Sequence, residues 1–428
     1  MRSNPPKAPR WSHSILSLTG VQRTVLFVAW LGWMFDIMDT ALFNFAKAPM
    51  VTEMLGSAQY RLKGAQVEGA IQTWFLIGWA IGGLVFGVLA DRWGRARTMI
   101  VTIAMYSLLT GITALCKTPE QAMAARFLTG LGIGGEWAAG AALVAETFPD
   151  ALRGLGAALL QTAAAFGPVI AALSNLALAG TSWRALFLVG VFPAFVCVLI
   201  RIRVSDPPRP VILPRIGGAF SGVAELFGDA RWRRNVIVAM VLGVVGVTGA
   251  GIAPFWIPNL VQEASAGLSD LVVRQRTSNA TMILHIGTLL GVFAFPWLAE
   301  RIGRKKTFAL FFACSPVFTF LALYGGADYT RLLVLTPLVA FFAIGLSSGF
   351  VLYFPELFPT RLRATGSGLA YNVGRIFSAP MPWLIGITMA AMNHNAAAGV
   401  LIASCIYLVG LAVLPFAPET MGVPLSDD

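Results

Sequence analysis

Charged residues are scarce in this sequence. Asp, Glu, Lys and Arg together make up 12% of its 428 residues, whereas an average soluble chain carries about 25%. Hydrophobic residues make up 57%. So few charges cannot cover the surface of a soluble domain, and the composition therefore predicts an integral membrane protein.

Residues typical of enzyme and metal sites are also scarce. The sequence has three histidines, no HExxH sequence, no GxxxxGK[ST] phosphate loop and no CxxC pair. These absences argue against a zinc enzyme and against ATP-driven transport. We therefore expect a protein that is not an enzyme and that uses no metal or organic cofactor. The four cysteines are interpreted as small buried hydrophobic residues in separate apolar segments: Cys116, Cys197, Cys314 and Cys405.

Twelve apolar segments of about 20 residues are each long enough to cross a membrane as a helix. A polar stretch at 202–233 separates the first six from the last six. The basic tail Met1–Arg23 leads into a segment too long for the apolar core of a cleavable signal, so we expect this first span to be retained. The segments lie at roughly 25–50, 71–90, 98–116, 121–145, 155–179, 184–201, 234–259, 280–299, 307–325, 331–354, 365–391 and 396–416.

Positive charge is shared unevenly between the two sides of these segments. Of the 31 Lys and Arg residues, 21 fall on the side that carries both termini and the central loop, and seven fall on the other side. The positive-inside rule places the richer side in the cytoplasm. We therefore predict a multi-pass protein of a bacterial inner membrane with both termini cytoplasmic. The net charge of +11 then reflects topology, and we expect no nucleic-acid partner, only the lipid bilayer and a small molecule.

An internal repeat divides the chain into two halves. ADRWGR at 90–95 recurs as AERIGR at 299–304, and ETFP at 146–149 recurs as ELFP at 356–359. The two offsets are 209 and 210 residues, which indicates a parallel duplication of six spans. Such repeats commonly bind substrate between them at the membrane midplane. The predicted units are a tail (1–23), a first bundle (24–201), a central loop (202–233), a second bundle (234–416) and a tail (417–428).

Two acids stand deep inside the first apolar segment. Asp36 and Asp39 are three residues apart, so they share one helical face, about 18–22 Å from the basic start of the segment. A carboxylate at the centre of a span costs roughly 2.5–3.5 kcal/mol, which favours a functional role. The alternative is that the acids snorkel to a helix end or lie in a packed polar seam. Arg126 of the fourth segment reaches about the height of Asp39, so we expect an ion pair, either permanent or one that opens when Asp39 takes a proton.

A second buried arginine lies near the middle of the eleventh segment. Arg375 has Tyr371 and Asn372 one turn earlier, and its planar guanidinium suits a carboxylate. We expect it to anchor a substrate carboxylate, unless Glu136 or Asp36 is its permanent partner.

Glu136 lies ten residues beyond Arg126 and about 15 Å nearer the cytoplasm, where it could serve an inner gate or a proton exit. Other possible cavity residues are Gln161, His285 and Tyr353; a lone histidine, however, is more often a hydrogen-bonded core residue.

Four motifs stand out along the chain: GVLADRWGRAR at 87–97, RFLTGLGIGGE at 126–136, Asp36-x-x-Asp39 and YNVGR at 371–375. With these motifs the sequence resembles the major facilitator superfamily over its whole length. The first motif resembles the loop between the second and third spans of that family. RFLTGLGIGGE at 126–136 resembles the fourth-span motif of its sugar porters and metabolite:proton symporters. Asp36-x-x-Asp39 and YNVGR at 371–375 are similar to aromatic-acid and sialate:proton symporters.

The resemblance to sugar porters is incomplete. PETMG at 418–422 is similar to their tail motif, with Met421 where lysine is usual. The seventh segment lacks their paired glutamines, and VSDPPR at 204–209 is a degenerate form of their motif after the sixth span. These departures favour an organic anion over a sugar.

The resemblance implies a fold of twelve transmembrane helices in two pseudo-symmetric six-helix bundles that work by alternating access. It also implies that residues of the repeated motifs, most of them charged, lock the cytoplasmic side shut in the outward-facing state. The simpler alternative is that they only orient the protein. These residues are Asp91, Arg92, Gly94, Arg95, Glu146 and Arg153 in the first half and Glu300, Arg304, Glu356 and Arg363 in the second.

We therefore predict a monomeric secondary active transporter that takes up a small organic carboxylate together with a proton. The alternatives are a proton-coupled sugar or polyol carrier, a facilitator or exporter of the same fold, and a membrane-embedded sensor. The expected proton-coupling residues are Asp39, Asp36, Arg126 and Glu136. The expected substrate contacts are Arg375, Asn372, Tyr371, Gln161, His285 and Tyr353.

Overall fold

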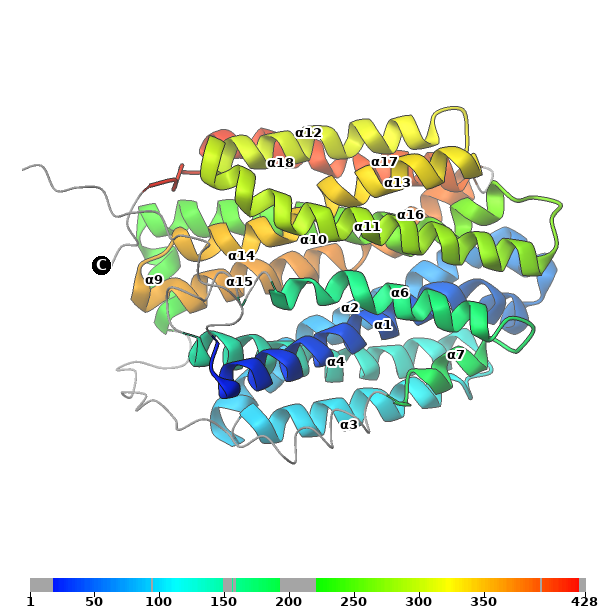
Figure 1. The fold of residues 1–428 in the computed structure, drawn as a ribbon, viewed down its shortest axis with the longest axis horizontal. Coiled ribbons are helices and arrows are strands. Elements are labelled where there is room, and N and C mark those ends of the chain that lie inside the picture. Colours follow the sequence, from blue (N-terminus) through cyan, green and yellow to red (C-terminus); the bar gives the residue numbers. More distant parts are fainter. Residues whose placement is uncertain are drawn as a thin grey trace, which may run out of the picture.

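The protein is a bundle of helices that run side by side along one axis (Figure 1). A computed structural model describes residues 18–93, 95–148, 156, 159–192, 221–392 and 395–422, and the regular structure in these ranges is helical. The helices of the first half are α1 (Gly20–Leu55), α2 (Ser57–Trp93), α3 (Arg95–Thr113), α4 (Pro119–Thr147), α6 (Ala163–Ala177) and α7 (Arg184–Val189). The connecting helix α9 (Ser221–Gly228) leads into α10 (Ala230–Glu263), α11 (Asp270–Ile302), α12 (Arg304–Leu323), α13 (Tyr329–Ala343), α14 (Leu346–Glu356), α15 (Thr360–Ser378), α16 (Met381–Ala391), α17 (Ala396–Ser404) and α18 (Ile406–Val413). A short 3₁₀ helix, η2 (Leu414–Phe416), follows.

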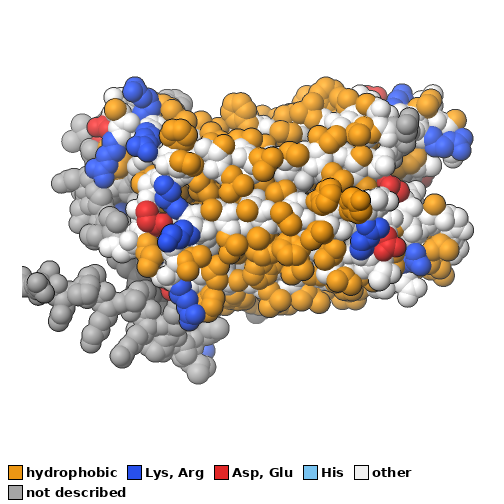
Figure 2. Space-filling view, turned by 90° about the horizontal axis from the view of Figure 1, so that it is seen from above, with side chains coloured by type: hydrophobic (Ala, Val, Ile, Leu, Met, Phe, Trp, Pro, Cys, Tyr) orange, Lys and Arg blue, Asp and Glu red, His pale blue; other side chains and the backbone are white. Residues whose placement is uncertain are grey.

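The outer surface has the pattern of a membrane protein. Eight helical stretches of the described chain are long and apolar enough to span a bilayer, and a shorter apolar helix covers Arg97–Thr113. On the face shown in Figure 2, hydrophobic side chains cover the middle of the bundle, whereas charged side chains gather toward its two ends. This distribution matches a hydrocarbon core bounded by water on both sides, as expected for the integral membrane protein predicted from composition.

Several helices are longer than the apolar segments that predicted them. Helix α1 has 36 residues, about 54 Å of helix against a hydrocarbon core of about 30 Å. Helix α2 begins at Ser57, so the predicted start near residue 71 is wrong, and α11 begins at Asp270 rather than near 280. Hydropathy marks only the length of a helix that lies within the hydrocarbon core. The helix itself continues into the polar layer beyond that core.

The last three spans are each made of two helices. Breaks follow α13 at Ile344–Gly345, follow α15 at Ala379–Pro380, and separate α17 from α18 at Cys405. Proline at 380 explains the second break, because its ring removes a backbone donor and clashes with the preceding turn. Each span continues past its break in roughly the same direction (Figure 1).

The bundle has two distinguishable ends. The start of α1 and the chain after η2 lie at one end, here called the terminal end, and the opposite end is called the far end (Figure 1). Helices α1, α2, α4 and α6 of the first half pack together, as do α10 to α18 of the second half. Across the halves, α2 packs against α16, α6 against α11, and α1 against α10.

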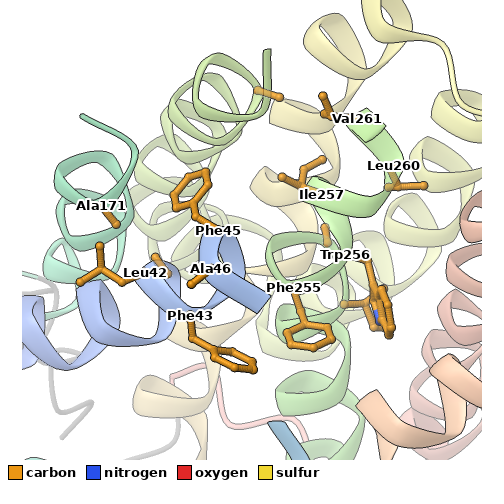
Figure 3. Close-up of a cluster of buried hydrophobic side chains, with 14 of the residues drawn as sticks. Leu42, Phe43, Phe45, Ala46, Ala171, Phe255, Trp256, Ile257, Leu260 and Val261 are labelled. Atoms are coloured by element: carbon orange, nitrogen blue, oxygen red, sulfur yellow. The ribbon is translucent and has the colours of Figure 1, made fainter. Parts of the chain in front are cut away.

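The two halves meet closely toward the far end. A Cβ on Gly69 of α2 would lie 2.2 Å from the Pro382 carbonyl oxygen, and one on Gly386 of α16 would lie 2.4 Å from that of Ala65. Small residues of this kind let two backbones touch in a membrane. Apolar side chains of α1 and α10 fill the adjacent core (Figure 3), including the stacked rings of Phe43 and Phe255, 6.4 Å apart.

Candidate functional site

The expected ion pair between α1 and α4 is present. Arg126 Nη1 donates to Asp39 Oδ2 over 2.7 Å, and the two side chains are 0% and 2% exposed. Asp39 Oδ1 accepts a second hydrogen bond from the Thr110 hydroxyl of α3, at 2.6 Å. Three helices of the first half therefore converge on a single carboxylate.

Aromatic rings enclose the guanidinium of this pair. The Arg126 Cζ lies 4.9 Å from the ring centre of Phe43 and 4.3 Å from that of Phe75. Such rings attract a cation through their quadrupole, and they exclude water from it. The Asp39 charge is thus the main compensation for a buried cation, and losing it would be costly.

Glycines set the position of α4 against α2. A Cβ on Gly130 would lie 2.2 Å from the Phe75 carbonyl oxygen, and one on Gly134 would lie 2.1 Å from that of Trp79. No larger residue fits at this backbone contact. The glycines of the fourth-span motif therefore bring Arg126 into the bundle interior, beside Phe75 of α2.

Arg375 lies on α15 where the second half meets α2. Its Cζ is 4.7 Å from the ring centre of Tyr371 on its own helix and 4.7 Å from that of Trp79 on α2. Trp79 in turn packs edge-on against Trp33 of α1, with ring centres 6.0 Å apart. The predicted anchor therefore faces an aromatic wall built by the first half. The Asn372 side chain also faces α2, because a Cβ on Gly83 would meet its oxygen at 3.4 Å.

The remaining acids of this region lie on α1 or against it. Asp36 is buried and within electrostatic reach of Arg375. Glu136 of α4 is also buried, and a Cβ on Gly32 would lie 2.2 Å from its Oε1. Because Gly32, Asp36 and Asp39 follow one face of α1, all four predicted proton-coupling residues lie on or against that face.

The other three predicted substrate contacts lie on α11, just before α6 and on α14. His285 of α11 is buried, with its Nδ1 3.2 Å from the Thr288 hydroxyl. Gln161 is buried just before α6. The Tyr353 hydroxyl donates to the Pro418 carbonyl oxygen at 2.6 Å, and its ring packs on Phe308. Tyr353 therefore belongs to the interior of the second half near the terminal end, where it holds the C-terminal segment.

The repeated motif of the second half forms an ion pair at the terminal end. Arg304 Nη2 contacts Glu356 Oε1 at 2.9 Å, and its Nε contacts Oε2 at 3.2 Å. Arg363 donates to the Pro355 carbonyl oxygen at 3.1 Å, and Glu300 is exposed near the end of α11. The expected inter-helix pairing is thus present between α12 and α14, within one half.

The PETM segment docks onto the same place. The Glu419 carboxylate accepts hydrogen bonds from the backbone N–H groups of Arg304 and Lys305 at 3.0 and 3.1 Å. Gly303, at φ +98°, makes room for this carboxylate, since a Cβ there would lie 2.8 Å from it. Burial opposes ionisation of Glu419, but these N–H groups and those of Thr420 and Met421 outweigh burial and lower its pKa. The N-terminus of α12 further favours a negative charge.

The matching motif of the first half lies partly outside the described residues. Gly94 and Arg153 are outside them, and of Asp91, Arg92, Arg95 and Glu146 only the helical backbone is described.

Among the described side chains, no cluster of His, Cys, Asp or Glu has metal-binding geometry.

The sequence analysis missed a second buried ion pair. Lys47 Nζ of α1 lies 3.4 Å from Glu68 Oε2 of α2, and both side chains are 0% exposed. Glu68 was overlooked because the second span was expected to begin near residue 71. The signal that could have revealed it is Lys47 itself, since a lysine inside a span requires a partner.

Comparison with known proteins agrees with this fold. The family model described as Major Facilitator Superfamily matches residues 29–382. A D-xylose-proton symporter of known structure superimposes with a TM-score of 0.74 at 19% identity, covering 94% of this chain and 99% of that one.

Related sequences of described function are transporters. A probable 4-methylmuconolactone transporter of Cupriavidus pinatubonensis is 29% identical over 95% of this chain and 92% of its own length. A putative niacin/nicotinamide transporter of Bacillus subtilis is 30% identical over 87% and 90%, respectively. A 4-hydroxybenzoate transporter of Pseudomonas aeruginosa is 25% identical over 88% of each chain. With its duplicated helical bundle and its buried charges, this chain is a membrane transporter, not an enzyme, and it belongs to the major facilitator superfamily.

Proposed function

We propose that this protein takes up a small organic carboxylate together with a proton by alternating access. The observation that supports this most directly is the buried contact between Asp39 and Arg126. A buried pair is weak evidence for stability, because desolvation offsets most of the attraction. A carboxylate kept deep in a membrane at such cost fits a role in which its charge changes during the cycle.

Proton coupling follows from the electrostatics of this pair. While Asp39 is ionised, Arg126 stabilises its charge; once the two separate, desolvation favours the protonated acid. A conformational change that opens the pair would therefore make Asp39 take a proton, and closing it would release that proton. Asp36 and Glu136, on or against the same face of α1, are the proposed continuation of the path toward the terminal end.

Carboxylate binding is assigned to Arg375 with Asn372 and Tyr371. A guanidinium offers a carboxylate two parallel hydrogen bonds, and Trp33 and Trp79 offer flat apolar surfaces beside it. Relatives named for 4-hydroxybenzoate and niacin support a planar aromatic acid among the candidates. Asp36 is buried and its charge acts on Arg375, so a bound carboxylate would compete with it. This competition links substrate binding to the acids of α1.

The terminal end is proposed to face the cytoplasm, because most of the Lys and Arg residues flank it in sequence. The far end, where the halves meet, then faces outward and is closed in this structure. A thermal-shift screen of the purified protein against carboxylates, sugars and amines tests the proposed substrate class. We expect stabilisation by one or more carboxylates, including 4-hydroxybenzoate or nicotinate as probes. Stabilisation by sugars or amines alone would contradict it.

A further inference from the structure

Lys47 and Glu68 form a buried ion pair that the proposed proton and substrate chemistry does not use. Lys47 lies eight residues beyond Asp39 on α1, toward the far end. The pair joins α1 to α2, both in the first half, with Nζ and Oε2 3.4 Å apart. The Tyr60 hydroxyl of α2 donates to the other oxygen of Glu68 at 2.6 Å. The first half therefore assembles this charged group by itself.

The second half completes the coordination of both charges. Lys47 Nζ donates to the Phe255 carbonyl oxygen of α10 at 2.7 Å and lies 3.6 Å from the ring centre of the same residue. The Asn259 side-chain amide of α10 donates to Glu68 Oε2 at 3.1 Å. Each charge of the pair thus has a partner in the opposite half.

A proline leaves one backbone carbonyl oxygen of this part of α10 without a helical hydrogen-bond donor. Pro258 has no N–H, so the carbonyl oxygen of Pro254 has no helical donor four residues later. The Asn44 side-chain amide of α1 supplies a donor at 3.2 Å. An unsatisfied buried carbonyl is costly, so this segment of α10 is stabilised by polar groups from α1.

We propose that Lys47 and Glu68 are a latch that holds the far end of the transporter closed by docking on residues 254–259 of α10. Alternating access, on which this inference rests, requires the two halves to separate at this end. The bonds to Phe255, Asn259 and Pro254 must then break, while the Lys47–Glu68 pair stays inside the first half. Opening would expose an intact ion pair that water solvates well.

This arrangement explains how a strong set of contacts can remain reversible. An ion pair with both members present contributes little net stability, because desolvation nearly offsets attraction. Replacing only one member of the pair leaves the other as an isolated buried charge, which is far more costly. The closed far end should therefore tolerate loss of both charges better than loss of one.

Distances between spin labels across the far end test the latch. Exposed Ser57 at the start of α2 and exposed Ser269 before α11 lie in opposite halves and can be replaced by cysteine in a chain whose four native cysteines are removed. In the parent protein we expect a short separation to dominate. Lys47→Met should move the distribution toward longer separations, and Lys47→Met/Glu68→Gln should recover part of the short population.

Two further variants guard against misfolding and against general effects. Asn259→Ala leaves the ion pair intact and removes one bond to the second half, so a smaller shift in the same direction is expected. Glu53→Gln breaks a contact with Arg184, 2.8 Å long and at the same end but within the first half, and should cause no shift. Unchanged distances in both Lys47→Met and Asn259→Ala, or a long separation in the parent, would overturn the latch.

The outcome is independent of the proposed symport. The distance measurement needs neither substrate nor a proton gradient. A parent protein that binds no carboxylate yet shows the predicted shifts would reject the proposed substrate and retain the latch.

Discussion

Arg126 and Asp39 are 87 residues apart in sequence, yet the guanidinium of one donates to the carboxylate of the other over 2.7 Å in a site closed to water. Each residue alone would be a costly charge inside a membrane protein. Their contact joins α1 to α4, and the Thr110 hydroxyl adds α3.

The first prediction concerns the stability of this pair. Arg126→Gln should leave Asp39 as an uncompensated buried charge and cost about 3–5 kcal/mol. Asp39→Asn/Arg126→Gln should recover part of this loss, because neither charge remains. Thermal unfolding in detergent would measure both. The exposed Glu53–Arg184 pair is the control, since breaking it should cost about 0–1 kcal/mol; equal losses at the two pairs would contradict the account.

The second prediction concerns Arg375 and a carboxylate found by the thermal-shift screen. Arg375→Lys keeps the charge but loses the two-pronged geometry, so binding should weaken by at least ~1.5 kcal/mol, about tenfold. Equilibrium binding to the purified variant measures this. Arg331→Lys makes the same chemical change outside the site and should have no effect. Full affinity in both Arg375→Lys and a stably folded Arg375→Ala would remove Arg375 from the binding site.

The third prediction concerns the repeated charges at the terminal end. Asp91→Asn or Glu146→Gln should shift the population toward opening at that end if these groups lock it, and Glu356→Gln should act similarly by releasing Arg304. Cysteine accessibility or label distances across the terminal end would report the shift. If the populations of all three variants match the parent, the motifs serve only to orient the protein.

The fourth prediction concerns the docked C-terminal segment. The pKa of Glu419 is lowered, so the ionised carboxylate stabilises the folded state. That contribution is fully present above its unfolded pKa of about 4.3 and is lost as the pH falls through its lower, folded pKa. Thermal unfolding should therefore show Glu419→Gln less stable than the parent at neutral pH, with the difference disappearing in acid. A difference that is the same at every pH would contradict an ionic role.

The sequence predicted much of this structure because its strongest signals are long and repeated. Apolar runs identify spans, and two separate motifs at nearly one offset identify the duplication. The Asp39–Arg126 pair could be predicted because the height of a residue in a span follows from counting along a helix. Counting gives the height of a residue but not the direction in which its side chain points, so the placement of Arg375 against Trp79 could not be foreseen.

Other features depended on contacts that no local pattern reveals. Tyr353 was expected near the substrate, but its hydroxyl reaches the Pro418 carbonyl, which lies 65 residues further along the chain. The Lys47–Glu68 pair was missed because α2 extends well beyond its apolar part. In both cases a polar group found its partner through packing between distant segments.

Transport by Asp39→Asn in proteoliposomes tests the central claim most directly. The variant mimics the permanently protonated acid, so a proton gradient should no longer drive uphill accumulation of the carboxylate. Exchange of labelled for unlabelled substrate should persist, because exchange needs no net proton movement. Asp36→Asn should be milder. Accumulation against a gradient by Asp39→Asn under an imposed proton gradient would contradict the assignment of Asp39 as the proton carrier.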